Sequence, residues 1–313
     1  MGCSFWGLRE QVVGIDMGDG YLCAVHAGCE RNGRWKLINA AWHEGEVASG
    51  DHELARQIRQ LWRTARFSTR TVRACLRAPS LLTRYFRYEH LDEKELPKVL
   101  RLEAEASLQL PPSDIALDWF VRRRAGGPGT TLEGLLVAVP RQDLDRFVRV
   151  LREAGLYPVA VDTGAAALLT LARAVQSRDN TPDPVCLVHA GAHSADLGIL
   201  TRDGICYARS MTARSPGTDK NGDFLIHSVC ENLKYVQFKL HGQPASTILV
   251  TGRPGIADSF ARQLQAESGL AVTEWNPLQT LARAPRISLR GLSEAQGKGG
   301  ILATAFALSV RGG

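Results

Sequence analysis

The sequence predicts an α/β protein of two similar lobes, and three observations support this prediction. Residues 12–25 form an apolar strand, a glycine turn and a returning strand. Residues 185–200 repeat that pattern in the middle of the chain. A polar stretch with two prolines, residues 176–184, separates the halves and is typical of a linker. Ligands of open α/β sheets bind at the carboxyl ends of strands, so the two turns can hold a phosphate chain between the lobes.

The first lobe is expected to cover residues 1–176. It opens with three strands, a helix and a strand that returns to the sheet. Leu54, Ile58 and Leu61 recur at helical spacing and give that helix its apolar stripe. The expected elements are strands at 12–16, 21–27, 35–42 and 71–76 and a helix at 52–67.

A compact α+β insert is expected at about residues 82–158. Its first helix is predicted to begin at Asp92, an N-cap residue with a glutamate three positions later. Pro97 is expected to distort one turn of it, and Pro111 to end it. The other expected elements are strands at 82–88, 116–123 and 132–139 and a helix at 141–154.

The second lobe is expected to cover residues 185–313 and to repeat the three-stranded opening of the first. A strand at 158–162 and an alanine- and leucine-rich helix at 163–175 lead toward it. Its expected elements are strands at 185–188, 195–200, 205–211 and 247–250, a short strand ending at Trp275, and helices that include 224–241 and 301–310.

Composition indicates an ordinary soluble protein. The 313 residues are 44% hydrophobic and 22% charged, with a net charge of +6. No segment approaches the roughly 20 apolar residues of a membrane span, and no signal peptide is expected before the first strand. Seven cysteines without a CxxC pair favour reduced thiols, buried at Cys23, Cys75, Cys186 and Cys206, in a reducing compartment. Cys186 and His189 point to opposite faces of one strand, which argues against a metal pair.

Three loops supply candidate cofactor-binding residues. Glycines let backbone N–H groups approach a phosphate, and a carboxylate at a strand end can hold Mg²⁺ through water. Each has a structural alternative: Asp16 can cap its own hairpin, and His193 and Ser194 can be turn residues that face solvent. No Ser-His-Asp arrangement, paired catalytic carboxylates or Walker-type loop is visible. The candidates are Asp16, Gly18, Asp19, Gly20, Gly191, His193, Ser194, Gly252, Arg253 and Gly255.

An arginine row recurs at helical spacing in the first lobe. Its members are Arg56, Arg59, Arg63, Arg66 and Arg70. One interpretation is the solvated face of an amphipathic helix, which we favour. The other is a contact surface for anionic lipid headgroups, an acidic partner or nucleic acid. Nucleic acid is the weakest of these, because no recognition module accompanies the arginines.

The order of these motifs resembles the PilM family of type IV pilus assembly, with FtsA and GspL as relatives. The residues that carry the resemblance are the opening loop at 13–18, the Leu-Pro-Pro-Ser-Asp turn at 110–114, the stretch 135–162, the second loop and hairpin at 186–211, and the glycine loop at 248–255. The resemblance covers nearly the whole chain. It implies an actin-like (ASKHA) two-lobed fold with a small α+β insert in the first lobe.

Departures from the family pattern concern the nucleotide side. His189 stands where the family has Asp, and imidazole is a poor ligand for a hard cation. Arg253 replaces a second glycine of the adenosine loop. Only residues 218–223 separate Gly217 from the next helix, where the family has a whole subdomain. The chain is therefore expected to have a reduced second lobe without the lid.

The resemblance implies a cytoplasmic scaffold of a type IV pilus or type II secretion inner-membrane platform. Its partner would be the cytoplasmic tail of a PilN-like membrane protein, bound between the first lobe and the insert. No ATP hydrolysis and no cofactor are expected. The alternative is an active ATP-binding protein or phosphotransferase that uses ATP with Mg²⁺, and a weaker alternative is a nucleic-acid-binding protein.

Overall fold

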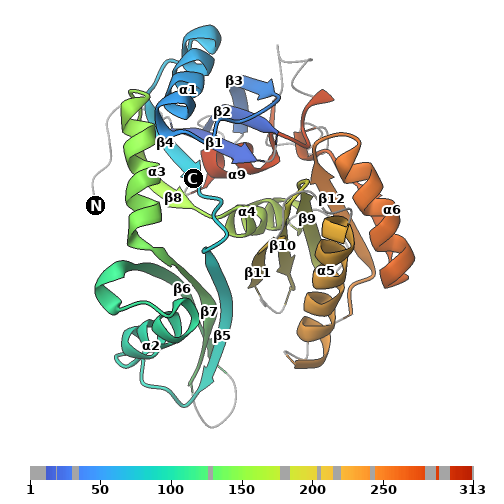
Figure 1. The fold of residues 1–313 in the computed structure, drawn as a ribbon. Helices are drawn as coiled ribbons and strands as arrows, with labels where there is room; N and C mark the ends of the chain where they lie inside the picture. Colours follow the sequence, from blue (N-terminus) through green and yellow to red (C-terminus); the bar gives the residue numbers. More distant parts are fainter. Residues whose placement is uncertain are drawn as a thin grey trace.

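The chain folds into three β-sheets and the helices that cover them (Figure 1). The structure is a computed structural model. It describes residues 12–18, 20–29, 35–125, 130–176, 184–202, 206–213, 220–239, 244–278, 287–288 and 297–311. No helix within these ranges is long and apolar enough to cross a membrane.

The first sheet has six strands in the order β14-β3-β2-β1-β4-β8. β1 and β2 form an antiparallel hairpin, and β1, β4 and β8 run parallel. Two helices, α1 and α3, cover one face, and α9 lies on the other. The bounds are β1 Val13–Gly18, β2 Tyr21–Cys29, β3 Trp35–Glu44, β4 Thr71–Cys75, β8 Tyr157–Asp162, β14 Ile287–Ser288, α1 Asp51–Ala65, α3 Arg141–Glu153 and α9 Ala303–Val310.

The second sheet has the order β11-β10-β9-β12-β13 and repeats the topology of the first. β9 and β10 pair antiparallel as β1 and β2 do, and β9 pairs parallel with β12 as β1 does with β4. The repeat read from the sequence is therefore a repeat in three dimensions. The bounds are β9 Val185–Ala190, β10 Ser194–Leu200, β11 Cys206–Thr212, β12 Thr247–Gly252, β13 Ala271–Glu274, α4 Gly164–Gln176, α5 Lys220–Lys239 and α6 Ile256–Ser268.

The third sheet is small and antiparallel, with the order β5-β7-β6 and the helix α2 packed on it. Its core includes Phe86, Leu100 and Leu136. The bounds are β5 Leu82–Glu89, α2 Leu96–Leu108, the 3₁₀ turn η1 Pro112–Asp114, β6 Ile115–Ala125 and β7 Thr130–Pro140.

Two details of the insert differ from the sequence prediction. Helix α2 begins at Leu96, four residues after Asp92, whose carboxylate instead accepts a hydrogen bond from the Lys94 N–H at 3.0 Å. Pro97 lies in the first turn, where a missing N–H breaks no helical bond. Helix α3 joins the first sheet as well as contacting the insert strands, because Leu151 belongs to the core beneath β1.

One continuous core joins the first two sheets. Helices α4 and α9 lie between them (Figure 1), and Leu168 and Phe306 share a cluster with Val25 and Leu187 from the two sheets. Helix α9, which the sequence assigned to the second lobe, runs along the first sheet. A Cβ on Gly14 of β1 would stand 1.8 Å from an α9 backbone oxygen, so the close approach requires glycine there. The domain bounds 1–176 and 185–313 stay a prediction.

Candidate functional site

The candidate cofactor-binding residue Asp16 lies at the carboxyl end of β1. Its side chain is fully buried. The Arg77 guanidinium donates hydrogen bonds to both carboxylate oxygens, from Nε to Oδ1 at 3.0 Å and from Nη2 to Oδ2 at 3.1 Å. The Tyr21 hydroxyl donates to Oδ2 at 2.8 Å. Both oxygens that could have faced a cation are therefore held by protein donors.

Arg77 also reaches the second sheet. Its Nη1 donates to Oδ2 of Asp196 on β10 at 2.5 Å, and Ser210 Oγ donates to the other oxygen at 2.6 Å. Asp196 is buried, and a Cβ on Gly164 of α4 would stand 2.0 Å from its Oδ2. One guanidinium thus bridges two buried carboxylates, one from each of the two large sheets.

His189 completes the bridge from the second sheet. Its Nε2 lies 2.9 Å from the Tyr21 hydroxyl, whose single proton goes to Asp16. The hydroxyl therefore accepts from His189, which places a proton on Nε2. His189 stands directly across the ladder from Asp196. His189 thus forms a hydrogen bond between the two large sheets.

The electrostatics of this cluster favour a fixed ion pair. Burial by itself raises the pKa of Asp16, but the charge and hydrogen bonds of Arg77 outweigh it, and the pKa lies below the ordinary 3.8. Burial and then the Asp16 charge raise the pKa of Tyr21 well above 10.0. Tyr21 therefore stays a neutral donor, and Asp16 stays ionised beside its cation.

These residues do not fit a magnesium ion. Mg²⁺ binds through one or two carboxylates that retain free oxygens, whereas Arg77 and Tyr21 occupy both oxygens of Asp16. The Tyr21 ring covers Gly18, where a Cβ would stand 2.2 Å from ring carbons. Arg253 Nη1 lies 2.8 Å from the Cβ position of Gly20. Protein side chains therefore fill the space beside the opening turn. Within the described residues, no group of three or more His, Cys, Asp or Glu could hold a metal ion.

The remaining predicted site residues are distributed around this cluster. The Gly191 N–H donates to the carbonyl of Ser194 at 2.8 Å, so this amide closes the hairpin. His193 is exposed. Gly252 lies against β9, where a Cβ would stand 2.3 Å from the Ala190 carbonyl oxygen, and Gly255 precedes α6. Asp19 lies outside the described residues.

Sequence reasoning missed three members of the cluster: Tyr21, Arg77 and Asp196. Asp196 carried a signal, because a charged residue in an otherwise apolar strand needs a partner when buried. Arg77 follows β4, whose carboxyl end lies beside that of β1. The reach of a side chain across two sheets has no sequence signature.

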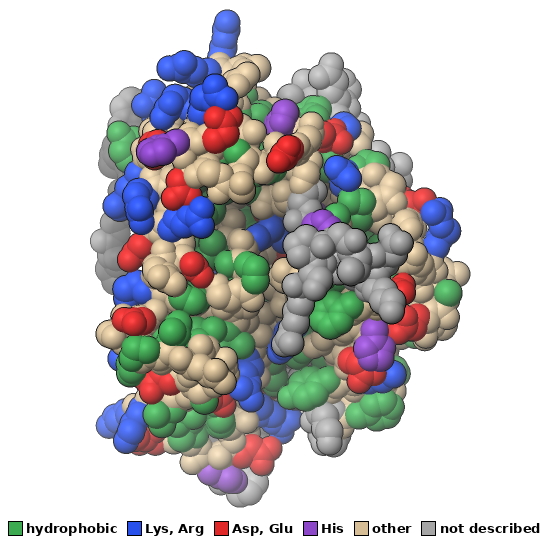
Figure 2. Space-filling view, viewed as in Figure 1, with side chains coloured by type: hydrophobic (Ala, Val, Ile, Leu, Met, Phe, Trp, Pro, Cys, Tyr) green, Lys and Arg blue, Asp and Glu red, His purple; other side chains and the backbone are tan. Residues whose placement is uncertain are grey.

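The arginine row divides into two parts. Arg56, Arg59 and Arg63 lie on α1, whereas Arg66 caps it with a left-handed φ of 53° and Arg70 lies beyond it. The prediction of five guanidinium groups on one helix face was therefore wrong. Arg59 Nη2 donates to the Glu153 carbonyl at the end of α3 at 2.7 Å. Lys and Arg side chains gather over α1 and α3 in Figure 2.

Comparison with solved structures shows which fold the chain has. A structure described as "PilM-PilN type IV pilus biogenesis complex" superposes with a TM-score of 0.74 at 20% identity, over 97% of this chain and 99% of that one. The cytoplasmic domain of EpsL from Vibrio cholerae matches with a TM-score of 0.48 at 12% identity, over 86% of this chain and 98% of that one. The chain has the actin-like α/β fold, with two mixed sheets and a small antiparallel one.

The family follows from the sequence profile described as "Type IV pilus assembly protein PilM", which matches residues 29–215, more than half of the chain. The chain belongs to this family of type IV pilus assembly proteins. No curated protein matches it at a significant level. The predicted resemblance and fold class are thereby confirmed.

Proposed function

We propose that this protein is a cytoplasmic scaffold that binds the tail of a PilN-like inner-membrane protein and does not hydrolyse ATP. The complex named in the similar solved structure supports a partner of this kind. The observation that supports the absence of hydrolysis is the Asp16–Arg77–Asp196 bridge, in which one guanidinium pairs with both carboxylates that metal chemistry would need.

The candidate tail groove lies between the first sheet and the insert. A cavity of about 310 Å³ opens there among α3, β6, β7 and β8. Its apolar walls include Leu117 of β6, Val137 of β7, Val148 of α3 and Val161 of β8. β8 and β6 are edge strands of their sheets in the described part of the chain. An extended tail can add to such an edge while its side chains enter the apolar pockets.

Exposed apolar side chains on β8 support the same groove. Tyr157 is 65% exposed and Val159 is 55% exposed. Val159 lies at the register shift between β4 and β8, and Val161, two residues further along, lines the cavity itself. A tail that docks along β8 would cover them. We expect an affinity in the micromolar range, about −8 kcal/mol.

Fluorescence anisotropy with labelled tail peptides from neighbouring genes tests this proposal. Val159→Lys should weaken binding, because it places a charge in the apolar contact. Leu102→Lys on α2 is the matched control, since Leu102 is also 55% exposed but lies on the helix of the insert and not on β8. Absence of binding by the folded protein at millimolar concentration would remove the scaffold proposal. Mg²⁺-dependent ATP turnover would then favour the phosphotransferase alternative.

A further inference from the structure

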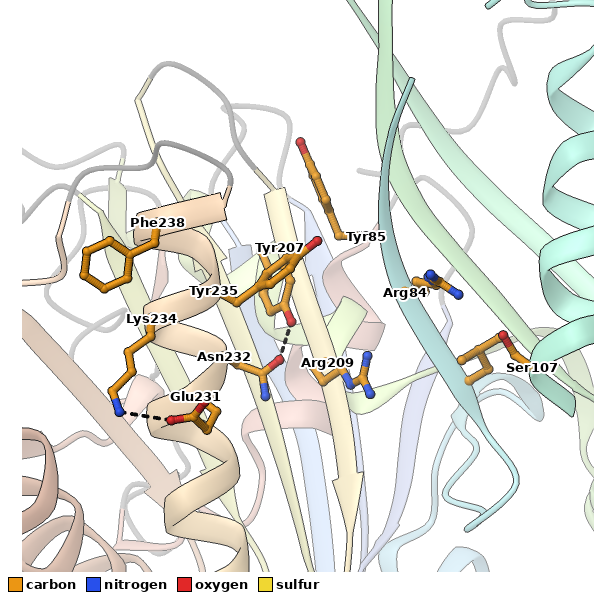
Figure 3. A pocket seen from close by; sticks show the side chains of 11 residues that line it. Arg84, Tyr85, Ser107, Tyr207, Arg209, Glu231, Asn232, Lys234, Tyr235 and Phe238 are labelled. Atoms are coloured by element: carbon orange, nitrogen blue, oxygen red, sulfur yellow. Dashed lines mark hydrogen bonds and ion pairs between the residues drawn. The ribbon is translucent and has the colours of Figure 1, made fainter. Parts of the chain in front are cut away.

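A second and larger cavity lies on another side of the insert. Its volume is about 730 Å³, within the range of small-molecule sites. The walls come from β5 and α2 of the insert and from β11 and α5 of the second sheet (Figure 3). It shares no residue with the Asp16 cluster or with the tail groove.

The two walls meet at the strands β5 and β11. The Ser210 N–H of β11 donates to Thr83 Oγ1 of β5 at 2.8 Å. The Tyr85 and Tyr207 rings are 6.1 Å apart between centroids. This contact fixes the spacing of the walls beside the cavity, so the site is preformed.

Aromatic rings line the side formed by β11 and α5. Tyr207 and Tyr235 lie 6.0 Å apart between centroids at 43°. The Tyr207 hydroxyl donates to Asn232, which holds the ring in place. Tyr235 is 43% exposed and Phe238 is 65% exposed, so both keep ring surface available for stacking. Among the described residues that line the cavity, Leu82 is the one aliphatic side chain, so an aliphatic peptide anchor has little to contact there.

Positive charge lies on both walls. Arg84 projects from β5 and Arg209 from β11 (Figure 3). Arg84 has a half-exposed side chain and one long ion pair, with Glu103 at 3.7 Å. The Arg209 side chain makes no ion pair or hydrogen bond with any residue that the structure describes. Lys234 is neutralised by Glu231 at 3.0 Å. Two guanidinium groups therefore face the cavity with little compensating negative charge.

We propose that this cavity binds a phosphorylated ligand with a planar ring, the chemistry of a nucleotide. Arg84 and Arg209 would hold the phosphate from opposite walls, because guanidinium groups match phosphate oxygens in geometry and charge. Tyr235 and Phe238 would stack on the ring, an interaction that every nucleobase offers. The ligand would join the insert to the second sheet without using the Asp16 cluster.

Calorimetry with the full chain at low salt tests the site with ATP, GTP, a cyclic dinucleotide and inorganic pyrophosphate. Arg84→Ala and Arg209→Ala should each weaken nucleotide binding about tenfold or more. Tyr235→Ala should weaken nucleotides about fivefold or more and leave pyrophosphate unchanged. Arg63→Ala on α1 is the control, an exposed arginine remote from the cavity. Circular dichroism of each variant establishes that it is folded.

Three results would overturn the proposal. The first is no binding of any nucleotide at millimolar concentration. The second is binding that both arginine variants retain but Arg253→Ala loses, which would assign the nucleotide to the loops near Asp16. The third is that pyrophosphate binds as tightly as the nucleotides, which would mean that the planar ring contributes nothing to recognition. None of these outcomes depends on whether the membrane-protein tail binds.

Discussion

Replacing Arg77 with Met is expected to destabilise the protein strongly, because it leaves two buried carboxylates without their cation. Asp16 has a side chain that is 0% exposed and Asp196 one that is 3% exposed. Removing one partner of a buried ion pair costs about 3–5 kcal/mol. That is a large part of the 5–15 kcal/mol by which a typical domain is stable. The midpoint of thermal unfolding should fall by about 6–15 °C.

The pH dependence gives an independent test. In the native protein the pKa of Asp16 is lower than in the unfolded chain. Ionised Asp16 therefore stabilises the folded protein above about pH 4, and this contribution to the free energy of unfolding is lost as the pH falls through the native pKa. Without Arg77, burial, the largest single influence, raises that pKa against only the Tyr21 hydrogen bond and the His189 charge. Protonation of Asp16 then removes a buried charge from the variant. Its loss in free energy of unfolding, relative to the native protein, should therefore be smaller at pH 4.5 than at pH 7.

Urea titrations at the two pH values measure both effects. Arg149→Met on α3 is the control, since it removes an exposed arginine and should change little. The triple variant Asp16→Asn, Arg77→Met, Asp196→Asn removes the charges together and should recover most of the loss. If Arg77→Met alone unfolds within about 1 kcal/mol of the native protein at pH 7, the bridge is not a structural ion pair and our account of the site fails.

Three further predictions concern catalysis, packing and the basic surface. ATP hydrolysis should be no faster than that of Asp16→Ala; a phosphate-release assay in which the substitution abolishes a clear Mg²⁺-dependent rate would contradict this. Gly14→Ala should lower the thermal midpoint, because a Cβ would stand 1.8 Å from an α9 backbone oxygen, whereas Gly50→Ala, in open space, should change it less; equal shifts would refute the packing argument. Reversing the charge of Arg59 and Arg63 should weaken cosedimentation with anionic vesicles, and less so at high salt, if α1 contacts the membrane; unchanged binding would leave the row as a solvated face.

The sequence predicted the fold best where structure depends on residues that are close together in the chain. Apolar strands broken by glycine turns specify hairpins locally, because the alternation has period two and the turn needs glycine. The doubled opening therefore predicted the two sheets and their matching topology. The predicted start of α2 was wrong because Asp92 accepts a hydrogen bond from an N–H in a turn and does not cap the helix. Helix caps and turns use the same residue types, so the sequence does not separate them.

The site was predicted only in part for a different reason. Asp16 and the glycine loops are read from the chain because each lies in one continuous segment. The partners of Asp16 are Tyr21, five residues away, and Arg77, 61 residues away. Arg77 in turn joins Asp196, 119 residues further along. A sequence shows that a buried charge needs a partner but does not show which side chain reaches it.

The residue pattern along the chain was enough to predict the fold and the family, and it placed a histidine at position 189. The partners of Asp16 became visible only in the folded chain, where one guanidinium joins two carboxylates and Tyr21 and His189 support it. The difference comes from how far apart in the chain the interacting residues lie. Strand pairing and turns follow from neighbours in the chain, whereas the energy of a buried charge depends on every group that the fold brings within a few ångströms of it.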